Sequence, residues 1–324
     1  MTFEKEIIMQ DMRALGFSPV LSASGTLGYF GEGWKFHRLT RHIGSSFDGM
    51  GLVAKTMTLH QREGNMPTNT VTLEPQDLFP DCIRVKFGKK AVINSVGLTN
   101  TGCEDLISRG IWQDMKKEVI LSFMTVAASP SERINEILAL VDILKREVPY
   151  MGEKPFAAQL NLSCPNTDEN PNELIKEASY LIDIAGEIGI PIIAKFNALA
   201  PAQAIAKLQN NSNCAGIATS NTLPWGSGPV NWSDIWGSDK SPIPQYGGGG
   251  YSGPALVPLV EKQIRELRAL GFTKYINAGG GITTYGDITR YKQAGADSIF
   301  MGSVAITRPW MVDRLIKYGL RAFS

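Results

Sequence analysis

The residues of this chain that could do chemistry stand where short apolar runs end. Lys55 and Lys195 each close such a run, and Asn221 and Thr222 follow another. Cys164 lies in the stretch LNLSCPN, among carboxamides and a hydroxyl. His, Asp and Glu are missing from these run ends, and the chain's three histidines all lie near its start. Ammonium groups, a thiol and carboxamides suit a neutral, planar, hydrogen-bonding ligand together with an anion.

Cys164 is the candidate reactive thiol. A free cysteine is more often a small buried hydrophobic residue, and we interpret Cys82, Cys103 and Cys214 in that way. Cys164 differs because a proline follows it and polar side chains flank it, a loop-borne setting in which a thiol can titrate. No histidine lies nearby in the sequence to form a nucleophilic pair. The thiol could therefore serve as a base or as a nucleophile.

Two glycine turns point to a phosphate group. Gly279, Gly280 and Gly281 follow one apolar run, and Gly302 and Ser303 follow the next. Without side chains, the backbone N–H groups of such turns can approach phosphate oxygens, and the Ser303 hydroxyl adds a donor. Either turn alone could merely reverse the chain. Two of them after adjacent final strands favour a phosphate site.

The elements that must position these residues alternate between strands and helices. Near-continuous apolar runs, typical of buried parallel strands, occur at 19–23, 51–56, 118–125, 155–163, 190–195, 214–219, 273–278 and 296–301. Amphipathic stretches predict helices at 131–148, where Ser131 starts a capped helix, and at 170–188, 200–210, 254–271, 284–295 and 309–320. Eight strands with interleaved helices fit a closed barrel or an open doubly wound sheet. Because no G-x-G-x-x-G follows the first strand, we expect a (β/α)₈ TIM barrel with its site at the carboxyl ends of the strands.

Two segments exceed a minimal barrel. Residues 60–95 form an insertion with strand-like patterns, and residues 222–252 form a long connection rich in Gly, Pro and Trp. Loops beyond about 12–15 residues are usually functional lids or disordered. The aromatic content of 222–252 favours an ordered cover near the barrel mouth, with aromatic contacts to the site. We interpret residues 1–324 as one domain that carries both insertions.

Bulk composition narrows the partners. The 32 Lys and Arg balance 31 Asp and Glu, so the net charge of +1 gives no footprint for nucleic acid or an anionic membrane. None of the four cysteines forms a C-x-x-C pair, which argues against a metal site and suits a reducing cytosol. The start, MTFEKEIIMQ, has no apolar signal core, and no apolar run approaches the roughly 20 residues of a membrane helix. We expect a cytoplasmic protein with a small-molecule substrate.

The motif around Cys164 resembles a known family. LNLSCPN is similar to the catalytic signature of dihydroorotate dehydrogenases, and its cysteine resembles the soluble class, where the membrane-bound class has serine. The resemblance continues in order through ASGT (23–26), AKTMTLHQREGN (54–65), NSVGLTN (94–100), SNT (220–222), YSGPA (251–255), AGGGI (278–282) and MGS (301–303). A lone ASG or GGG would be weak, but the ordered set is specific.

The resemblance implies an FMN-dependent oxidoreductase that converts dihydroorotate to orotate in pyrimidine biosynthesis. Cys164 would take the C5 proton while hydride passes from C6 to FMN, and Lys55 and Lys195 would complete the catalytic set. The residues implied for FMN are Ala23, Ser24, Gly25, Lys55, Thr56, Asn94, Asn161, Lys195, Ser252, Gly253, Gly280, Gly281, Gly302 and Ser303. Those implied for the substrate are Lys55, Asn94, Gly97, Leu98, Asn161, Asn166, Asn221 and Thr222.

Other functions stay open at this point. A related FMN enzyme acting on a uracil-like ring would keep most of these residues, although the carboxylate-facing Gly97, Leu98 and Asn166 argue for orotate. A flavin-free lyase with a Schiff base on Lys195 and a non-catalytic ligand-binding barrel are the further alternatives. Fold-level analogy alone could not choose among them.

The sequence also departs from the family pattern near the expected barrel mouth. Lys195 precedes FNALA where the family usually has a Pro-containing segment, and residues 29–46 lack a clear counterpart. These departures concern the substrate and the electron acceptor rather than the flavin. The resemblance implies a homodimer. Because the chain has no cysteine cluster for an iron–sulfur centre, any such centre would belong to a separate electron-transfer subunit.

Overall fold

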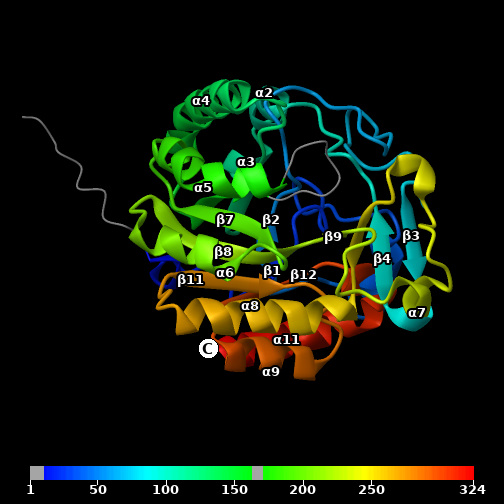
Figure 1. Ribbon diagram of the computed structural model, residues 1–324. Helices are drawn as coiled ribbons and strands as arrows, with labels where there is room; N and C mark the ends of the chain where they lie inside the picture. Colours follow the sequence, from blue (N-terminus) through cyan, green and yellow to red (C-terminus); the bar gives the residue numbers. More distant parts are fainter. Residues whose placement is uncertain (1–10, 163–170) are drawn as a thin grey trace, which may run out of the picture.

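The apolar runs of the sequence become eight parallel strands that close into a barrel (Figure 1). The computed structural model describes residues 11–162 and 171–324. Strand order is β1-β12-β11-β8-β7-β6-β5-β2, and hydrogen bonds from Ser22 N to Gly51 O and from Gly51 N to Val20 O, each 2.9 Å, join β1 to the β2 end. The barrel strands are β1 Val20–Ser22, β2 Leu52–Val53, β5 Val119–Phe123, β6 Phe156–Asn161, β7 Ile192–Asn197, β8 Cys214–Asn221, β11 Tyr275–Gly279 and β12 Ser298–Met301. The expected TIM barrel and its eight strands are confirmed.

Helices surround the barrel and bury one face against it (Figure 1). The longer ones match the six expected helices, with short 3₁₀ turns completing three of them. They are α4 Pro130–Glu147, α5 Pro171–Gly186, α6 Ala202–Ala206, α8 Val257–Ala269, α9 Tyr285–Ala294 and α11 Val312–Phe323. Short helices that the sequence did not predict are α1 His37–Thr40, α2 Cys103–Ser108, α3 Ile111–Asp114, α7 Trp232–Trp236 and α10 Val304–Thr307.

The start of α4 corrects the expected cap. Ser129, not Ser131, is the N-cap residue: its hydroxyl accepts the Glu132 N–H, and the Glu132 side chain accepts the Ser129 N–H, both at 3.3 Å. Pro130 then occupies the first helical position, where its missing N–H costs nothing. This capping box satisfies two backbone donors reciprocally, which Ser131 inside the first turn could not do.

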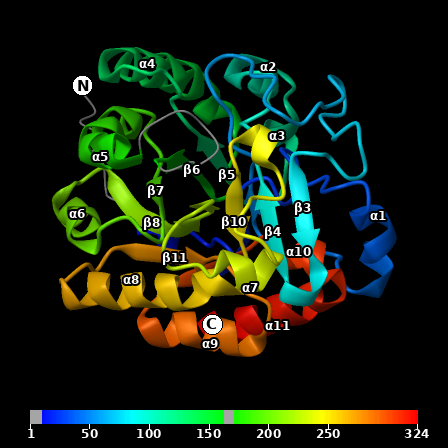
Figure 2. The ribbon, with the colours of Figure 1, turned by 45° about the vertical axis from the view of Figure 1, so that its right-hand side comes forward.

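The two insertions form one antiparallel sheet of their own, in the order β3-β4-β10-β9. Strands β3 Ile83–Lys86 and β4 Ala91–Asn94 come from the first insertion, and β9 Leu223–Pro224 and β10 Gly250–Ser252 from the second. Figure 2, in which this side comes forward, shows β3, β4 and β10 side by side. Residues 60–95 are thus strand-forming only over 83–94. The strands of the second insertion were missed because two or three residues are too few for an alternating pattern.

Side chains from the barrel strands fill the interior of the barrel. Met12, Leu21, Ile120 and Ile193 belong to a buried cluster there that includes Tyr275 and other strand residues. A filled interior leaves the ends of the strands as the place for a site. In the part of the chain that the structure describes, no helix is long and apolar enough to cross a membrane.

Candidate active site

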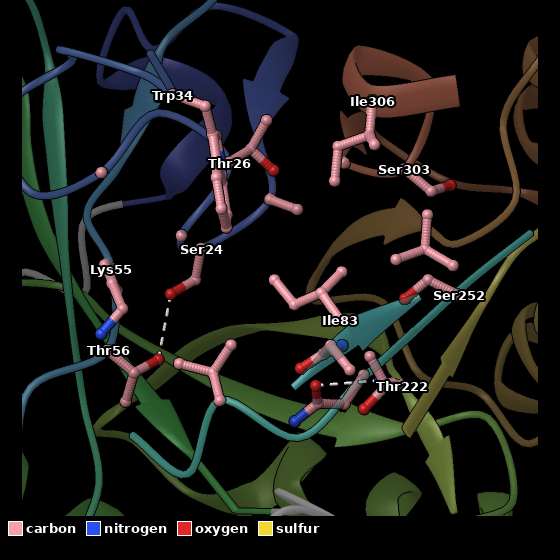
Figure 3. Close-up of a pocket in the computed structure, with 18 of the residues that line it drawn as sticks. Ser24, Thr26, Trp34, Lys55, Thr56, Ile83, Thr222, Ser252, Ser303 and Ile306 are labelled. Atoms are coloured by element: carbon pink, nitrogen blue, oxygen red, sulfur yellow. Dashed lines mark hydrogen bonds between the residues drawn. The ribbon is translucent and has the colours of Figure 1, made fainter. Parts of the chain in front are cut away.

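A pocket of about 240 Å³ opens where the barrel strands end, close to the lower end of the roughly 300–1,000 Å³ typical of ligand sites. Residues at the ends of β6 and β7, turns after β1, β2, β8, β11 and β12, and residues of the second sheet line it. In Figure 3, Ser24, Lys55 and Thr56 lie on one side of the pocket and Ser303 and Ile306 lie across from them. From the predicted set, the pocket brings together Ala23, Ser24, Gly25, Lys55, Thr56, Asn94, Gly97, Leu98, Asn161, Lys195, Asn221, Thr222, Ser252, Gly280, Gly281, Gly302 and Ser303.

Three predicted residues stand apart from that set. Gly253 does not line the pocket itself, but its carbonyl backs Gly281, the nearest neighbour a Cβ there would meet. Cys164 and Asn166 lie outside the described residues. The remaining cysteines behave as the sequence indicated. Burial raises the pKa of Cys82 and Cys214 to about 11 and that of Cys103 to about 12, so all three stay thiols at neutral pH.

Both lysines bring a positive charge to the pocket wall. Lys55 follows β2, and its Nζ donates to the Tyr29 hydroxyl at 3.0 Å and to the Thr99 carbonyl. Lys195 lies in β7 and is only 6% exposed, with its Nζ 6.0 Å from the centroid of the Phe300 ring. Two ammonium groups that line one pocket suit a ligand that carries negative charge or carbonyl oxygens.

The carboxamides of Asn161 and Asn221 form a connected group at the ends of β6 and β8. Asn221 Nδ2 donates to Asn161 Oδ1 at 3.0 Å, and the Thr222 N–H donates to Asn221 Oδ1 at 2.9 Å. The Thr222 Oγ1 is buried and has no hydrogen-bond partner among the described residues. A buried hydroxyl without a partner is unfavourable, so this atom points to a ligand that would satisfy it.

A strained loop supplies backbone donors beside the carboxamides. Gly97 and Leu98 both have positive φ, +73° and +57°, and a leucine in this region costs about 1–2 kcal/mol. Asn100 braces the loop: its Nδ2 donates to the Leu98 carbonyl at 2.7 Å and to the Thr58 hydroxyl at 2.8 Å. The bracing holds the loop in a shape that an unsupported chain would avoid.

The glycine turns form a cradle that side chains would fill. A Cβ on Gly281 would lie 2.4 Å from the Gly253 carbonyl oxygen, and one on Gly302 would lie 3.0 Å from the Ala23 Cβ. The Tyr291 hydroxyl donates to the Gly280 carbonyl at 2.5 Å, which fixes this turn from behind. Bare backbone with a neighbouring hydroxyl on Ser303 is the donor set that a phosphate group takes. The cradle therefore fits the phosphate end of a flavin mononucleotide, with the lysines and carboxamides left for its ring and for a substrate.

Hydroxyl groups connect the first turn to the barrel. Ser24 Oγ donates to the Ala54 carbonyl at 2.8 Å and lies 3.0 Å from Thr56 Oγ1, a contact drawn in Figure 3. Thr56 Oγ1 in turn lies 2.9 Å from Ser122 Oγ. This chain of hydroxyls fixes the position of the turn after β1, so that Gly25 presents its backbone to the pocket.

The structure adds pocket residues that the sequence did not reveal. Tyr29, Glu32 and Trp34, from the segment after ASGT, and Glu74, from the first insertion, all line the pocket. The strand ends themselves carry no carboxylate, but these loops bring two carboxylates to the pocket. Glu32 accepts the N–H groups of Tyr29 and Phe30 in its own loop at 3.0 and 2.7 Å, whereas Glu74 pairs with Arg38 of α1 and so joins the first insertion to the segment after β1. The departure of 29–46 from the family pattern was the available signal.

The tryptophans of 222–252 do not reach the pocket. Trp225 and Trp232 pack together with ring centroids 4.5 Å apart, and Trp232 meets Tyr251 edge-on at 5.7 Å. Trp232 and Trp236 pack against a small separate core that includes Leu223 and Tyr251. The expected aromatic contacts to the site are wrong, because these rings stabilise the second sheet instead. The segment reaches the pocket through Thr222 and Ser252 at its two ends.

Comparison with known proteins identifies relatives over most of the chain. The family model described as dihydroorotate dehydrogenase matches residues 39–323. The dihydroorotate dehydrogenase B (NAD(+)) catalytic subunit of Listeria welshimeri is 24% identical over 309 residues, 92% of this chain and 87% of that protein. Dihydroorotate dehydrogenase A (fumarate) of Limosilactobacillus reuteri is 27% identical over 300 residues, 90% and 85%. In fold, the chain is similar to the DHODH of Eimeria tenella in complex with ferulenol, with TM-score 0.63, 20% identity and coverage of 93% and 80%.

Proposed function

Because the chain belongs to the dihydroorotate dehydrogenase family, a family of flavin-dependent oxidoreductases, we propose that it oxidises dihydroorotate to orotate with FMN. The observation that carries this proposal is the meeting of two binding chemistries in one pocket. The same pocket is lined by the glycine turns, which suit a phosphate, and by two lysines, three asparagines and the Gly97–Leu98 loop. Because the chain belongs to an oxidoreductase family, the hypotheses of a flavin-free lyase and of a non-catalytic ligand-binding barrel are excluded.

In this proposal the FMN phosphate is held by Gly280, Gly281, Gly302 and Ser303. The ring and ribityl parts would lie along the residues Ala23, Ser24, Gly25, Lys55, Thr56, Asn94, Asn161, Lys195 and Ser252, with Gly253 backing the Gly281 turn. Bound FMN would supply a hydride acceptor for C6 of the substrate. Lys195, buried at the same wall, would place its positive charge where negative charge develops during that transfer.

The substrate ring would lie against the carboxamides. A pyrimidinedione edge alternates donors and acceptors, and Asn94, Asn161 and Asn221 each offer both on one planar group. The Thr222 hydroxyl, which has no hydrogen-bond partner within 11–162 and 171–324, gives one more group for the same edge. The amides of Gly97 and Leu98, held by their braced loop, would bind the carboxylate, with Asn166 and the Lys55 ammonium completing the set.

Cys164 is proposed as the base that removes the C5 proton. In the sequence it follows Asn161 by three residues, and Asn161 ends β6 at the pocket. The two ammonium groups of the pocket would favour the thiolate over the thiol and so lower the pKa that a base needs near neutral pH. A thiolate at this place would act without a histidine partner.

The relatives suggest how the electrons leave. Several are named catalytic subunits of an NAD(+) enzyme, and others are named for fumarate. Among the described residues, no group of three or more His, Cys, Asp or Glu could hold a metal ion. We propose that this chain is one cytoplasmic domain that works as a homodimer and passes electrons through a separate subunit.

The test is an anaerobic substrate panel with the purified protein. We expect FMN to be released on denaturation, and dihydroorotate to bleach the bound flavin faster than dihydrouracil or dihydrothymine. A colourless protein that cannot be loaded with FMN would exclude the proposal. Preferential bleaching by dihydrouracil would instead identify a related ring reductase. Light scattering and co-purification test the homodimer and the second subunit.

A further inference from the structure

The Lys55 ammonium is held by a buried tyrosine that lies before the segment matched by the family model. Tyr29 is 2% exposed, and its hydroxyl accepts from Lys55 Nζ at 3.0 Å while donating to the Thr99 carbonyl at 2.9 Å. Lys55 Nζ also donates to that carbonyl and lies 5.0 Å from the centroid of the Tyr29 ring. The phenol, the ammonium and the carbonyl thus form a closed triangle of contacts.

The backbone of Tyr29 is itself fixed from both sides. The Tyr29 N–H donates to Glu32 Oε1 at 3.0 Å, and the Tyr29 carbonyl accepts from the Trp112 indole at 2.7 Å. Trp112 is fully buried, so this anchor cannot move freely. The phenol is therefore presented to Lys55 by a rigid support, which reduces the entropy lost when the ammonium is held in one place.

The triangle connects three parts of the site. Tyr29 belongs to the turn after β1, Lys55 follows β2, and Thr99 belongs to the braced loop that contains Gly97 and Leu98. Burial raises the pKa of Tyr29 well above its usual value, so the phenol stays protonated. A protonated phenol must donate its one proton to the Thr99 carbonyl and keep its lone pairs for Lys55.

We propose that Tyr29 is a positioning residue, which holds the Lys55 ammonium in place for the anionic substrate and ties it to the carboxylate-binding loop. This inference rests on the proposed function, because it takes Lys55 and the 97–98 amides as substrate contacts. Tyr29 itself transfers no proton and forms no bond to the substrate. Its contribution is to align Lys55 with the loop before the substrate arrives.

Tyr29→Phe keeps the ring and removes the hydroxyl. A hydrogen bond to a charged group contributes enough that its loss raises a dissociation constant roughly tenfold. We expect about a tenfold rise in the orotate Kd, measured by calorimetry, and a matching rise in the KM for dihydroorotate, with FMN content unchanged. In a Lys55→Met background the same substitution should change the orotate Kd by less than about twofold, because coupled residues are not additive.

Tyr275→Phe is the matched control. Tyr275 is similarly buried at 4%, and its hydroxyl donates to Ser298 at 2.5 Å, but it does not line the pocket. We expect it to lower the melting temperature and to leave the orotate Kd unchanged.

An unchanged orotate Kd in Tyr29→Phe would overturn the inference. So would a tenfold effect that persists without the Lys55 ammonium, or an equal effect from Tyr275→Phe. A wild-type protein that binds neither FMN nor orotate would instead contradict the proposed function itself. If Tyr29→Phe folds poorly, two further variants take its place: Tyr29→Trp, which keeps an aromatic ring, and Lys55→Arg, which keeps the positive charge. Both must weaken orotate binding for the inference to survive.

Discussion

Substitution of Gly281 tests the proposed phosphate cradle most directly. Gly281 has φ +76°, so any side chain there adds about 1–2 kcal/mol of backbone strain. Its Cβ would lie 2.4 Å from the Gly253 carbonyl oxygen and 3.0 Å from Pro254 Cα, all backbone atoms that cannot rotate away. Overpacking of this kind costs about 1–3 kcal/mol more. Gly281→Ala should therefore lower the free energy of unfolding by about 2–5 kcal/mol.

The affinity for FMN distinguishes a phosphate-binding role of the Gly281 turn from a purely structural one. Displacing the Gly253 and Gly281 backbones should raise the FMN Kd at least about tenfold in Gly281→Ala, equivalent to 1.4 kcal/mol. Gly281→Asp would add a carboxylate beside the phosphate, and two such charges 4 Å apart repel by roughly 4 kcal/mol at the effective dielectric of a protein surface. Because the side chain can turn partly away, we expect at least about a 100-fold loss of affinity.

Gly271→Ala is the control for backbone strain alone. Gly271 has a similar φ, +82°, but a Cβ there would meet nothing within 4 Å. We expect it to lose about 1–2 kcal/mol of stability and no FMN affinity. The assay is fluorescence titration of the apoprotein with FMN, with urea unfolding in parallel. Wild-type FMN affinity in Gly281→Asp, or an equal loss in Gly271→Ala, would refute the phosphate assignment.

Three further outcomes are expected. Cys164→Ala should reduce flavin bleaching by dihydroorotate about 10²–10⁴-fold while orotate still binds, and Cys164→Ser should regain a little activity at high pH; less than a tenfold loss would count against a base. Thr222→Val should weaken orotate binding about two- to tenfold. The ligand-free protein should be at least as stable as the wild type, because the substitution removes a buried hydroxyl that has no partner among the described residues. Reduced stability with unchanged orotate binding would contradict this expectation. Burial lowers the pKa of His37 from 6.5 to about 4, so the stability of its neutral form is present above pH 6.5 and lost as the pH falls toward 4. Between pH 7 and pH 4, the free energy of unfolding measured with urea should fall by on the order of 3 kcal/mol more in the wild type than in His37→Gln. An equal fall in the two proteins would refute this expectation.

The barrel could be predicted from the sequence because its strands are buried on both faces. Runs such as those that became β5 and β7 are apolar at most positions and buried throughout. That pattern requires helices on the outside of the sheet, and the parallel direction then brings all carboxyl ends to one mouth. For the same reason Lys55, Lys195 and Asn221, far apart in sequence, could be expected in one pocket, and the structure places them there.

Long-range features could not be predicted in this way. Strands β9 and β10 exist because Leu223 and Tyr251 pair with each other and Tyr251 with Ile93, contacts that no local pattern contains. The position of Trp225 against Trp232 depends on the same pairing, since the Trp225 N–H donates to the Gly249 carbonyl next to β10. Tyr29 was missed because the contacts of its hydroxyl, with Lys55 after β2 and with Thr99 in the 94–100 loop, join segments that are far apart in the sequence. Short stretches of sequence predict helices and strands from residue propensities and periodicity, whereas these features depend on contacts between distant parts of the chain.

The second sheet explains why the two insertions had to be built together. Asn94 is the last residue of β4 and is paired with Gly250 of β10, so the loop that carries Gly97 and Leu98 leaves the sheet at a point fixed by the other insertion. Ser95 Oγ donates to the Tyr246 carbonyl at 2.9 Å, which is a second contact that holds the start of this loop against the other insertion. The positive φ values of the loop can persist only under such constraint. The insertions therefore act on the pocket as a unit: β10 and its neighbours set where the loop amides stand, while the barrel sets where the lysines and the glycine cradle stand.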